Sequence, residues 1–267
     1  MSAPDPAALL AALEATWPPA AQTTLGPFRL RDGAGGGKRV SAAVAMAAAA
    51  EADIAAAEAA MRARGEQPLF MVRAEDAALD DALAARGYAQ MDATLFYAAP
   101  VANLARKPAP ITLFPIWPPL QIIRDIWTER GIDAARQAVM ERAAAPKAAL
   151  IARVADRAAG AAFVACHADV AMLHAVEVLP NLRRQGGARN LVTGAAWWAQ
   201  DQGMRWLALA VTRDNAAARA VYDGLGMTVC GGYHYRISQA PGAAGRGDSA
   251  GTLAGTMRRK GGRLKSS

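Results

Sequence analysis

The segment Val178 to Val192, VLPNLRRQGGARNLV, places a Gly-Gly pair and several arginines directly before a predicted helix. Backbone N–H groups at the start of a helix converge on an anion, and the helix dipole adds to the attraction. Gly186 and Gly187 have no side chains to block that approach. Positive charge comes from three neighbours, Arg183, Arg184 and Arg189. The segment therefore indicates a phosphate-binding loop, with a simple turn before a helix as the alternative.

Two common phosphate-binding patterns are excluded for this loop. A Walker A loop needs Lys-Ser/Thr after its last glycine, and no such pair follows Gly187. The dinucleotide fingerprint G-x-G-x-x-G is also missing. The loop is instead followed by a helix ending in WWAQDQG, a strand LALAV and a second helical segment, NAAARAVYDGLGM, from Asn215 to Met227. Two motifs at a fixed spacing are more specific than either one alone.

Together these segments resemble the GNAT superfamily of acyl-CoA N-acyltransferases, in the same order and at the same spacing. The loop of that family reads R/Q-x-x-G-x-G/A, and its positions correspond here to Arg183, Arg184, Gln185, Gly186, Gly187 and Ala188. The later helix of the family reads N-x-x-A-x-x-x-Y followed by Gly and an apolar residue, here Asn215, Ala218, Tyr222, Gly226 and Met227. The family usually has an aromatic residue after that glycine, so Met227 is a departure. The resemblance covers about Leu113 to Ile237.

The resemblance implies an α/β fold with a mixed, mostly antiparallel central sheet flanked by helices. It also implies acetyl-CoA as co-substrate, with its pyrophosphate on the loop, including Arg189, and its pantetheine arm along the strand through Val176 and Val178. In the family, this strand and the one that begins here at Trp206 splay apart around the thioester. Asn215 would hydrogen-bond the pantetheine arm or cap its own helix.

Acyl transfer to an amine needs a base, a donor to the developing oxyanion and an acid for the thiolate. Tyr222 matches the family tyrosine that faces the sulfur of CoA, with an ordinary core aromatic as the alternative. The backbone N–H of Val178 is the expected oxyanion donor. The base is left open between His174 and Glu177, which strand alternation places on opposite faces unless a bulge intervenes. The alternative to a base role for His174 is an ordinary buried core histidine. The alternative for Glu177 is a role in binding the amine.

The rest of the chain predicts two halves and a tail. We expect a smaller GNAT-like α/β domain at 1–105, a catalytic GNAT domain at 106–237 and a disordered basic tail at 238–267, with a Pro-bearing linker at 99–110. The second half contains three consecutive strands with short turns, KAALIARVAD, GAAFVACHADV and AMLHAVEVL, which predict an antiparallel meander. In the first half, GPFRLRD and KRVSAAV flank a glycine turn and predict a strand pair.

An internal repeat relates the two halves. A shift of 139 residues aligns LFMVRAEDAALDDALAARGY with ALAVTRDNAAARAVYDGLGM without a gap. Asp76 then occupies the position of Asn215, and Leu83 that of Tyr222. The first half is therefore expected to be degenerate, to lack the chemistry and to form a wall of the acceptor pocket.

Charge and composition narrow the classes of partner. The net charge is +7, but the segment 238–267 alone carries six basic residues against one acidic residue, so the remainder has an ordinary surface charge. We therefore expect no specific nucleic-acid partner. Cys166 and Cys230 lie in apolar segments without disulfide or metal spacing and are expected to be small buried residues. No signal peptide or membrane span is recognised, so a cytoplasmic location without a membrane partner is expected.

The sequence thus predicts an acetyl-CoA-dependent N-acetyltransferase acting on a primary amine of a small molecule or peptide. The alternative is a non-catalytic acyl-CoA-binding or protein-interaction module. The apolar and aromatic segment Phe114 to Trp127 suggests a hydrophobic or aryl acceptor, and core packing explains it equally well. Neither the identity of the acceptor nor the oligomeric state can be inferred from these patterns.

Overall fold

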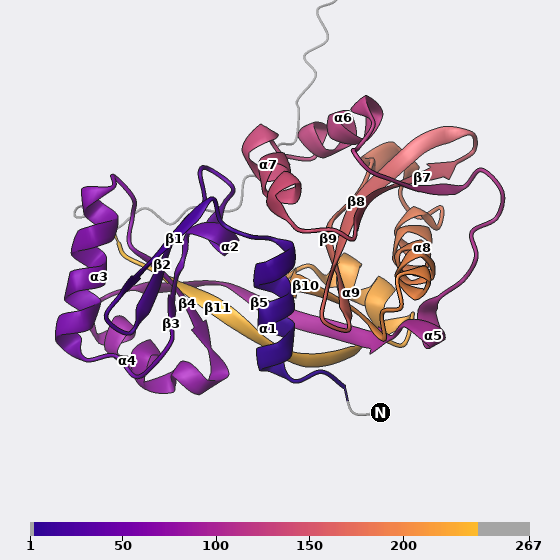
Figure 1. The fold of residues 1–267 in the computed structure, drawn as a ribbon. Helices are drawn as coiled ribbons and strands as arrows, with labels where there is room; N and C mark the ends of the chain where they lie inside the picture. Colours follow the sequence, from indigo (N-terminus) through magenta and orange to yellow (C-terminus); the bar gives the residue numbers. More distant parts are fainter. Residues whose placement is uncertain (1–2, 240–267) are drawn as a thin grey trace, which may run out of the picture.

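The computed structural model describes residues 3–239, and in that range the strands form one eleven-stranded sheet. The strand order is β1-β2-β3-β4-β11-β5-β10-β9-β8-β7-β6, and the sheet runs through both halves of the chain (Figure 1). Most neighbouring strands are antiparallel; β3 with β4 and β9 with β10 are parallel. The expected fold class is confirmed. The predicted tail lies outside the described residues from position 240 onward.

The second half contributes one end of the sheet. Its first four strands are β6 (Leu113–Ile116), β7 (Lys147–Val154), β8 (Arg157–His167) and β9 (Val170–Val178). The pairs β6–β7, β7–β8 and β8–β9 are all antiparallel, so the predicted meander is confirmed. No strand was predicted at β6, which contains Pro115. A proline cannot donate to a strand ladder, but β6 is the edge strand of the sheet, where this is tolerated.

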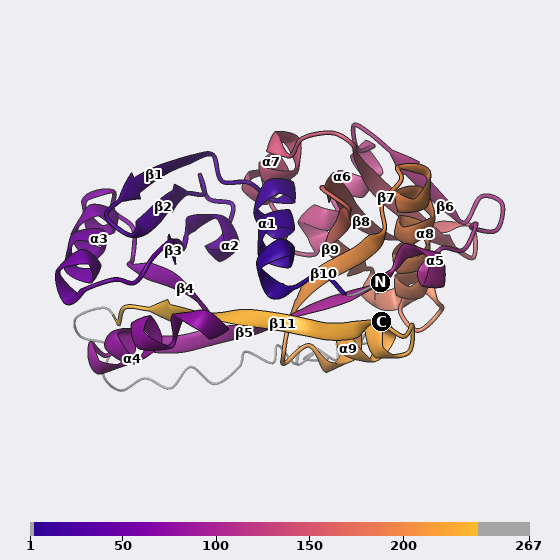
Figure 2. The ribbon, with the colours of Figure 1, turned by 60° about the horizontal axis from the view of Figure 1, so that its bottom comes forward.

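The centre of the sheet contains a reciprocal exchange of strands. Strand β5 (Ala89–Pro100) of the first half lies between β10 (Trp206–Thr212) and β11 (Thr228–Ile237) of the second half. Strand β11 in turn pairs with β4 (Leu69–Arg73) of the first half. The last strand of each half therefore pairs with strands of the other half. The two long strands, β5 and β11, extend through both halves of the sheet (Figure 2).

Helices cover both faces of this sheet. The helices on one face are α3 (Glu51–Ala63), α4 (Ala77–Ala85), α8 (Gly187–Asp201) and α9 (Ala216–Asp223). The other face carries α1 (Pro6–Thr16), α6 (Gln121–Glu129) and α7 (Ala134–Arg142). Figure 2 shows α4 and α9 below the long strands and α1 above them. Helix α1 packs on strands from both halves, so its apolar side chains join the two cores.

Three helices begin at carboxylates that accept hydrogen bonds from the backbone. Asp5 accepts a hydrogen bond from Ala8 N at the start of α1, and Asp133 accepts one from Arg136 N at the start of α7. Helix α3 begins at Glu51. The carboxylate of Asp53 accepts from Ala50 N there, which satisfies one of the free amides of the first turn.

Two expectations for the first half were partly wrong. The partner of β2 (Phe28–Asp32) is the short strand β3 (Ala43–Ala45), because Lys38–Ser41 forms a helical turn, α2, after the glycines. Strand β1 (Ala21–Leu25), which pairs with β2, was not expected. The predicted linker begins too early: Ala99 and Pro100 pair with Leu207 and Trp206. The short helix α5 (Val101–Leu104) follows, so the irregular part of that linker begins only after it.

The repeat inferred from the sequence has the same geometry in both halves. Gly87 and Gly226 follow α4 and α9 with φ of 79° and 76°, the left-handed conformation that favours glycine at a helix end. Tyr88 N donates to Leu83 O at 3.0 Å, and Met227 N donates to Tyr222 O at 3.1 Å. Leu83 is fully buried where its counterpart Tyr222 carries a hydroxyl, so the first half lacks that polar group.

Candidate functional site

The loop before α8 has the geometry of an anion site. A 3-10 turn, η2 (Pro180–Leu182), leads into it, and Gly186 precedes the helix with a left-handed φ of 85°. No side chain caps the first turn of α8. Its leading N–H groups therefore face outward from a fifteen-residue helix, next to the exposed side chains of Arg183, Arg184 and Gln185. The turn that the sequence predicts before α8 is therefore present, and phosphate binding there stays a prediction.

Two arginines of this loop donate hydrogen bonds to backbone carbonyl groups. Arg183 Nε donates to Val178 O at 3.3 Å, and Arg189 Nη2 donates to Gly224 O at 3.1 Å, which links the loop to the end of α9. A Cβ added to Gly187 would lie 3.6 Å from the nearest protein atom, an ordinary contact. Contacts within the protein therefore do not require glycine at position 187. Close approach of a ligand to the N–H groups of Gly187 and Ala188 would be a reason for glycine there.

Strands β9 and β10 separate beyond a short parallel pairing. Their register joins residues 170–173 to 206–209, although β9 continues to Val178 and β10 to Thr212. Val176 and Val178 lie on the part of β9 that has left its neighbour, and both are partly buried. The divergence expected from the family resemblance is therefore present, and it leaves this stretch of β9 facing a gap in the sheet.

A β-bulge in β9 brings the two candidate bases to one face of the sheet. Ala175 has a positive φ of 51°, and the register with β8 shifts there. Phe163 pairs with His174, and Ala161 pairs with Glu177. Because Phe163 and Ala161 are two residues apart on β8, their partners share a face. The bulge allowed for in the sequence analysis exists.

Glu177 lines a cavity of about 390 Å³ that lies between the two halves. Its walls include Trp17, Arg39 and Thr94 from the first half and Thr212 and Glu177 from the second. The cavity therefore opens at the divergence of β9 and β10, with the first half as its far wall. Glu177 also pairs with Arg130, with 3.3 Å between Oε2 and Nε.

His174 lies behind this wall and is 3% exposed. Thr16 Oγ1 donates to Ala12 O at 2.6 Å, so its only hydrogen is used and it must accept from His174 Nε2 at 2.8 Å. The other ring nitrogen, Nδ1, then accepts from Arg39 Nη1 at 3.4 Å. Burial, and secondly the charge of Arg39, hold the pKa of His174 well below its ordinary value of 6.5. Both ring nitrogens of a neutral imidazole are therefore engaged.

Tyr222 lies on α9 with its side chain buried, 6% exposed. Burial, with a smaller contribution from the carboxylate of Glu177, raises the pKa of Tyr222 to about 12. Its ring centroid is 5.6 Å from that of Tyr97 on β5. A phenol with this pKa is fully protonated at neutral pH, so the Tyr222 hydroxyl carries a proton there.

Asn215 caps its own helix. Its Oδ1 accepts from Ala218 N at 3.1 Å at the start of α9, which is one of the two roles allowed for in the sequence analysis. The side chain is exposed. Its amide nitrogen is the group that remains to contact a pantetheine arm.

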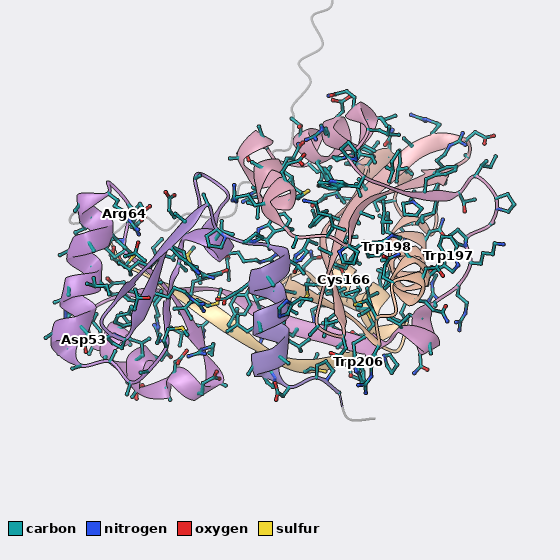
Figure 3. The ribbon with its side chains drawn as sticks, viewed as in Figure 1. Asp53, Arg64, Cys166, Trp197, Trp198 and Trp206 are labelled. Atoms are coloured by element: carbon teal, nitrogen blue, oxygen red, sulfur yellow. The ribbon has the colours of Figure 1, made fainter. Side chains whose placement is uncertain are left out.

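The cysteines carry no sign of reactivity at this site. Both are partly buried, and Cys166 on β8 lies well inside the second half (Figure 3). Burial raises the pKa of Cys166 to about 12, so it remains a thiol at neutral pH. Figure 3 also shows Asp53 on α3 and Arg64 directly after that helix, at the outer end of the first half and far from Trp197 and Trp198 of α8.

Several residues of the cavity were missed by sequence reasoning. Trp17 follows the last residue of α1, and Arg39 follows the glycine run that was interpreted as a turn between two strands. Tyr233 and Tyr235 alternate on β11 and so share a face, a pattern visible in GGYHYRI. The signals were present, but only the exchange of strands brings them beside Glu177.

The comparisons with known proteins agree with this geometry. Residues 116–227 match the family model described as Acetyltransferase (GNAT) family. A GCN5-related N-acetyltransferase from Kribbella flavida is similar in structure, with a TM-score of 0.67, 18% identity and coverage of 87% of this chain and 95% of that one. A tandem GNAT protein from the clavulanic acid biosynthesis pathway has a TM-score of 0.57, 16% identity and coverage of 85% and 86%. No curated protein sequence matches the chain.

Residues 116–227 are therefore a GNAT acetyltransferase domain, and the whole described chain has the fold of GNAT N-acetyltransferases, a tandem GNAT protein among them. The family resemblance found in the sequence is confirmed. Membership of this domain in the family supports an acyltransferase activity in general terms. Among residues 3–239, none of the helices is long and apolar enough to cross a membrane.

Proposed function

We propose that this protein transfers an acetyl group from acetyl-CoA to a primary amine that enters the cavity beside Glu177. The observation that carries the proposal is that Glu177 lines the cavity at the divergence of β9 and β10, while its carboxylate also raises the pKa of the buried Tyr222 hydroxyl. A carboxylate that can take a proton and a phenol that can give one fit acyl transfer between two ligands.

The loop residues fit the anionic end of CoA. The uncapped first turn of α8 supplies N–H donors through Gly187, Ala188 and Arg189, and Arg183 and Arg184 add charge beside them. Gln185 and Gly186 shape the turn. Val176 and Val178 would lie along the pantetheine arm, and the N–H of Val178 would support the oxyanion. Bound acetyl-CoA supplies a thioester carbonyl as the acyl donor.

In this proposal Glu177 is the base and Tyr222 the acid. Glu177 lines the cavity and takes the proton that the amine loses as its N–C bond forms. Tyr222 Oη supplies the proton that the sulfur gains as the C–S bond breaks, so the proton count balances. His174 is better suited to a positioning role, because both its ring nitrogens are engaged and its pKa is lowered.

The test is the release of free thiol from acetyl-CoA in the presence of small amines, amino acids, aminoglycosides and peptides with free N-termini. We expect release with one class of acceptor and at least a hundredfold slower turnover, roughly, in Tyr222→Phe. Turnover that is unchanged in Tyr222→Phe would remove this residue from the mechanism. Binding of acetyl-CoA without release for any amine would favour the non-catalytic alternative.

A further inference from the structure

The cavity between the two halves carries more positive than negative charge. Its lining has four basic side chains, Lys38, Arg39, Arg130 and Arg136, and two acidic ones, Asp92 and Glu177. Lys38 Nζ pairs with Asp92 Oδ2 at 2.5 Å, and Arg130 pairs with Glu177. Among residues 3–239 the ion pairs include neither Arg39 nor Arg136. Two positive charges therefore line the cavity without an ion-pair partner among the described residues.

Arg39 is the better placed of these two charges, because it is partly buried in the wall and Arg136 is exposed. Its neighbours are neutral: Nη1 lies 3.4 Å from His174 Nδ1, and Cζ lies 5.9 Å from the ring centroid of Trp17. The hydroxyl groups of Tyr233 and Tyr235 are its other polar neighbours. A partly buried guanidinium among neutral groups is stabilised when an anion binds beside it.

Arg39 lines the same cavity as Glu177, the proposed base. Arg39 comes from α2 of the first half, whereas Glu177 comes from β9 of the second half, and both line the same cavity. An amine held for proton transfer to Glu177 would therefore extend toward Arg39. Trp17 and Tyr233 line the space between halves with aromatic surface, which suits an apolar body between two polar ends.

On the basis of the proposed function, we infer that the acceptor is an amine that also carries a carboxylate, and that Arg39 binds this carboxylate while Glu177 receives the amine. The planar guanidinium matches a carboxylate through two parallel hydrogen bonds. His174 would hold the guanidinium in that orientation through Nδ1. The first half, which has Leu83 where the second half has Tyr222, would then contribute Arg39 to select the acceptor.

The experiment compares amino carboxylates with their carboxamides. Matched pairs are glycine, β-alanine, γ-aminobutyrate and phenylalanine, each beside its amide, titrated into the full chain with CoA present and then assayed for thiol release with acetyl-CoA. We expect one carboxylate to bind about tenfold or more tightly than its amide. Equal or tighter binding of the amides throughout would overturn the inference, and so would binding of neither member of any pair.

Substitutions at Arg39 test whether this residue causes the preference for carboxylates over carboxamides. In Arg39→Met the carboxylate should lose its advantage, and in Arg39→Lys it should keep only part of it, because the two-pronged contact is lost. Arg136→Gln, at the exposed position, serves as the matched control and should keep the preference. A preference that survives in Arg39→Met, with the fold checked by thermal unfolding, would overturn the assignment. The comparison within the wild type does not depend on how well the variants fold.

Two further outcomes separate this inference from the proposed function. Phosphoethanolamine binding more tightly than every carboxylate would overturn the carboxylate assignment in favour of a phosphate. Thiol release that is equally fast with carboxylates and amides would contradict the inference and leave the acetyltransferase activity standing. Preferential carboxylate binding without thiol release would support the role of Arg39 and count against the proposed function.

Discussion

Arg39 Nη1 lies 3.4 Å from His174 Nδ1, and this contact joins the first half of the chain to strand β9 of the acetyltransferase domain. Because Thr16 occupies the other ring nitrogen, the imidazole is fixed from both sides, by α1 and by α2. The same histidine that the sequence offers as a base is therefore part of the contact between the halves.

This contact predicts a pH dependence of stability. The pKa of His174 is lowered in the folded protein, so below pH 6.5 the unfolded chain binds a proton that the folded chain excludes. The free energy of unfolding should therefore be highest above that pH and fall as the pH decreases, by at most about 1.4 kcal/mol per pH unit for one proton. Thermal unfolding between pH 7.5 and about 5 measures it.

His174→Gln tests the assignment, because a glutamine amide can replace both hydrogen bonds without titrating. The pH dependence should become flatter, while turnover at neutral pH falls by less than about tenfold. His234, which pairs with Asp80, provides a control, since His234→Gln leaves His174 in place. A loss of turnover of a hundredfold or more, roughly, in His174→Gln would restore this histidine as the base.

Tyr222→Phe should lower kcat by about a hundredfold or more and change the KM for acetyl-CoA by less than about threefold. The hydroxyl is needed when the thiolate leaves, and its removal leaves the packed ring in place. Tyr97→Phe is the matched control, because the ring of Tyr97 packs against that of Tyr222 at a tilt of 54° and Tyr97 is buried as well. Steady-state kinetics of both variants check the prediction; equal effects would show that packing alone is responsible.

Glu177→Gln should reduce kcat by about a hundredfold, because an amide cannot take the proton that the amine loses. The same change also breaks the ion pair with Arg130, so a control must lose a similar pair elsewhere. Glu141→Gln does this, since Glu141 pairs with Arg124 at 2.7 Å on the outer face of α6 and α7. Activity that persists in Glu177→Gln with an unaltered pH profile would exclude this carboxylate as the base.

Gly187→Ala separates ligand binding from folding. A Cβ at this position makes only ordinary contacts within the protein, so the free energy of unfolding should change by less than about 0.5 kcal/mol. The methyl group would lie beside Val178, on the strand that the proposal places along the pantetheine arm, and the Kd for CoA should rise by about tenfold or more. Calorimetric titration and thermal unfolding measure the two quantities. Unchanged CoA affinity would place the pyrophosphate elsewhere.

Gly203→Ala is a useful comparison for Gly186, the first glycine of the loop. Gly203 and Gly186 both have a left-handed φ, 75° and 85°, with no atom near an added Cβ. Alanine should cost each site about 1 kcal/mol of stability for backbone reasons. Only Gly186→Ala should also weaken CoA binding, because Gly203 lies at the opposite end of α8.

The second half of the fold was predictable because its signals are local. The meander β7 to β9, the glycine-opened helix α8 and the capped helix α9 each follow from residues close in sequence, such as Gly186 and Asn215. The repeat was also visible, since a glycine such as Gly226 that needs a positive φ at a helix end recurs at a fixed spacing.

The remainder depends on contacts between distant residues. No local pattern shows that β5 lies between β10 and β11, because strand pairing is decided by the packing of whole faces. Arg39 therefore looked like part of a turn, although it lies on the cavity that Glu177 lines. The bulge at Ala175 was foreseen only as a condition, since its positive φ is imposed by the tertiary structure and not by residue type.

The most direct test of the acetyltransferase account follows the acetyl group itself. Acetyl-CoA carrying an isotopically labelled acetyl group is incubated with the wild type and the amine panel, and the acceptors are examined by mass spectrometry and NMR. The account predicts label on the amine nitrogen of at least one acceptor, and about a hundredfold less in Glu177→Gln. Labelled acetate released by hydrolysis, with no labelled amine, would contradict it.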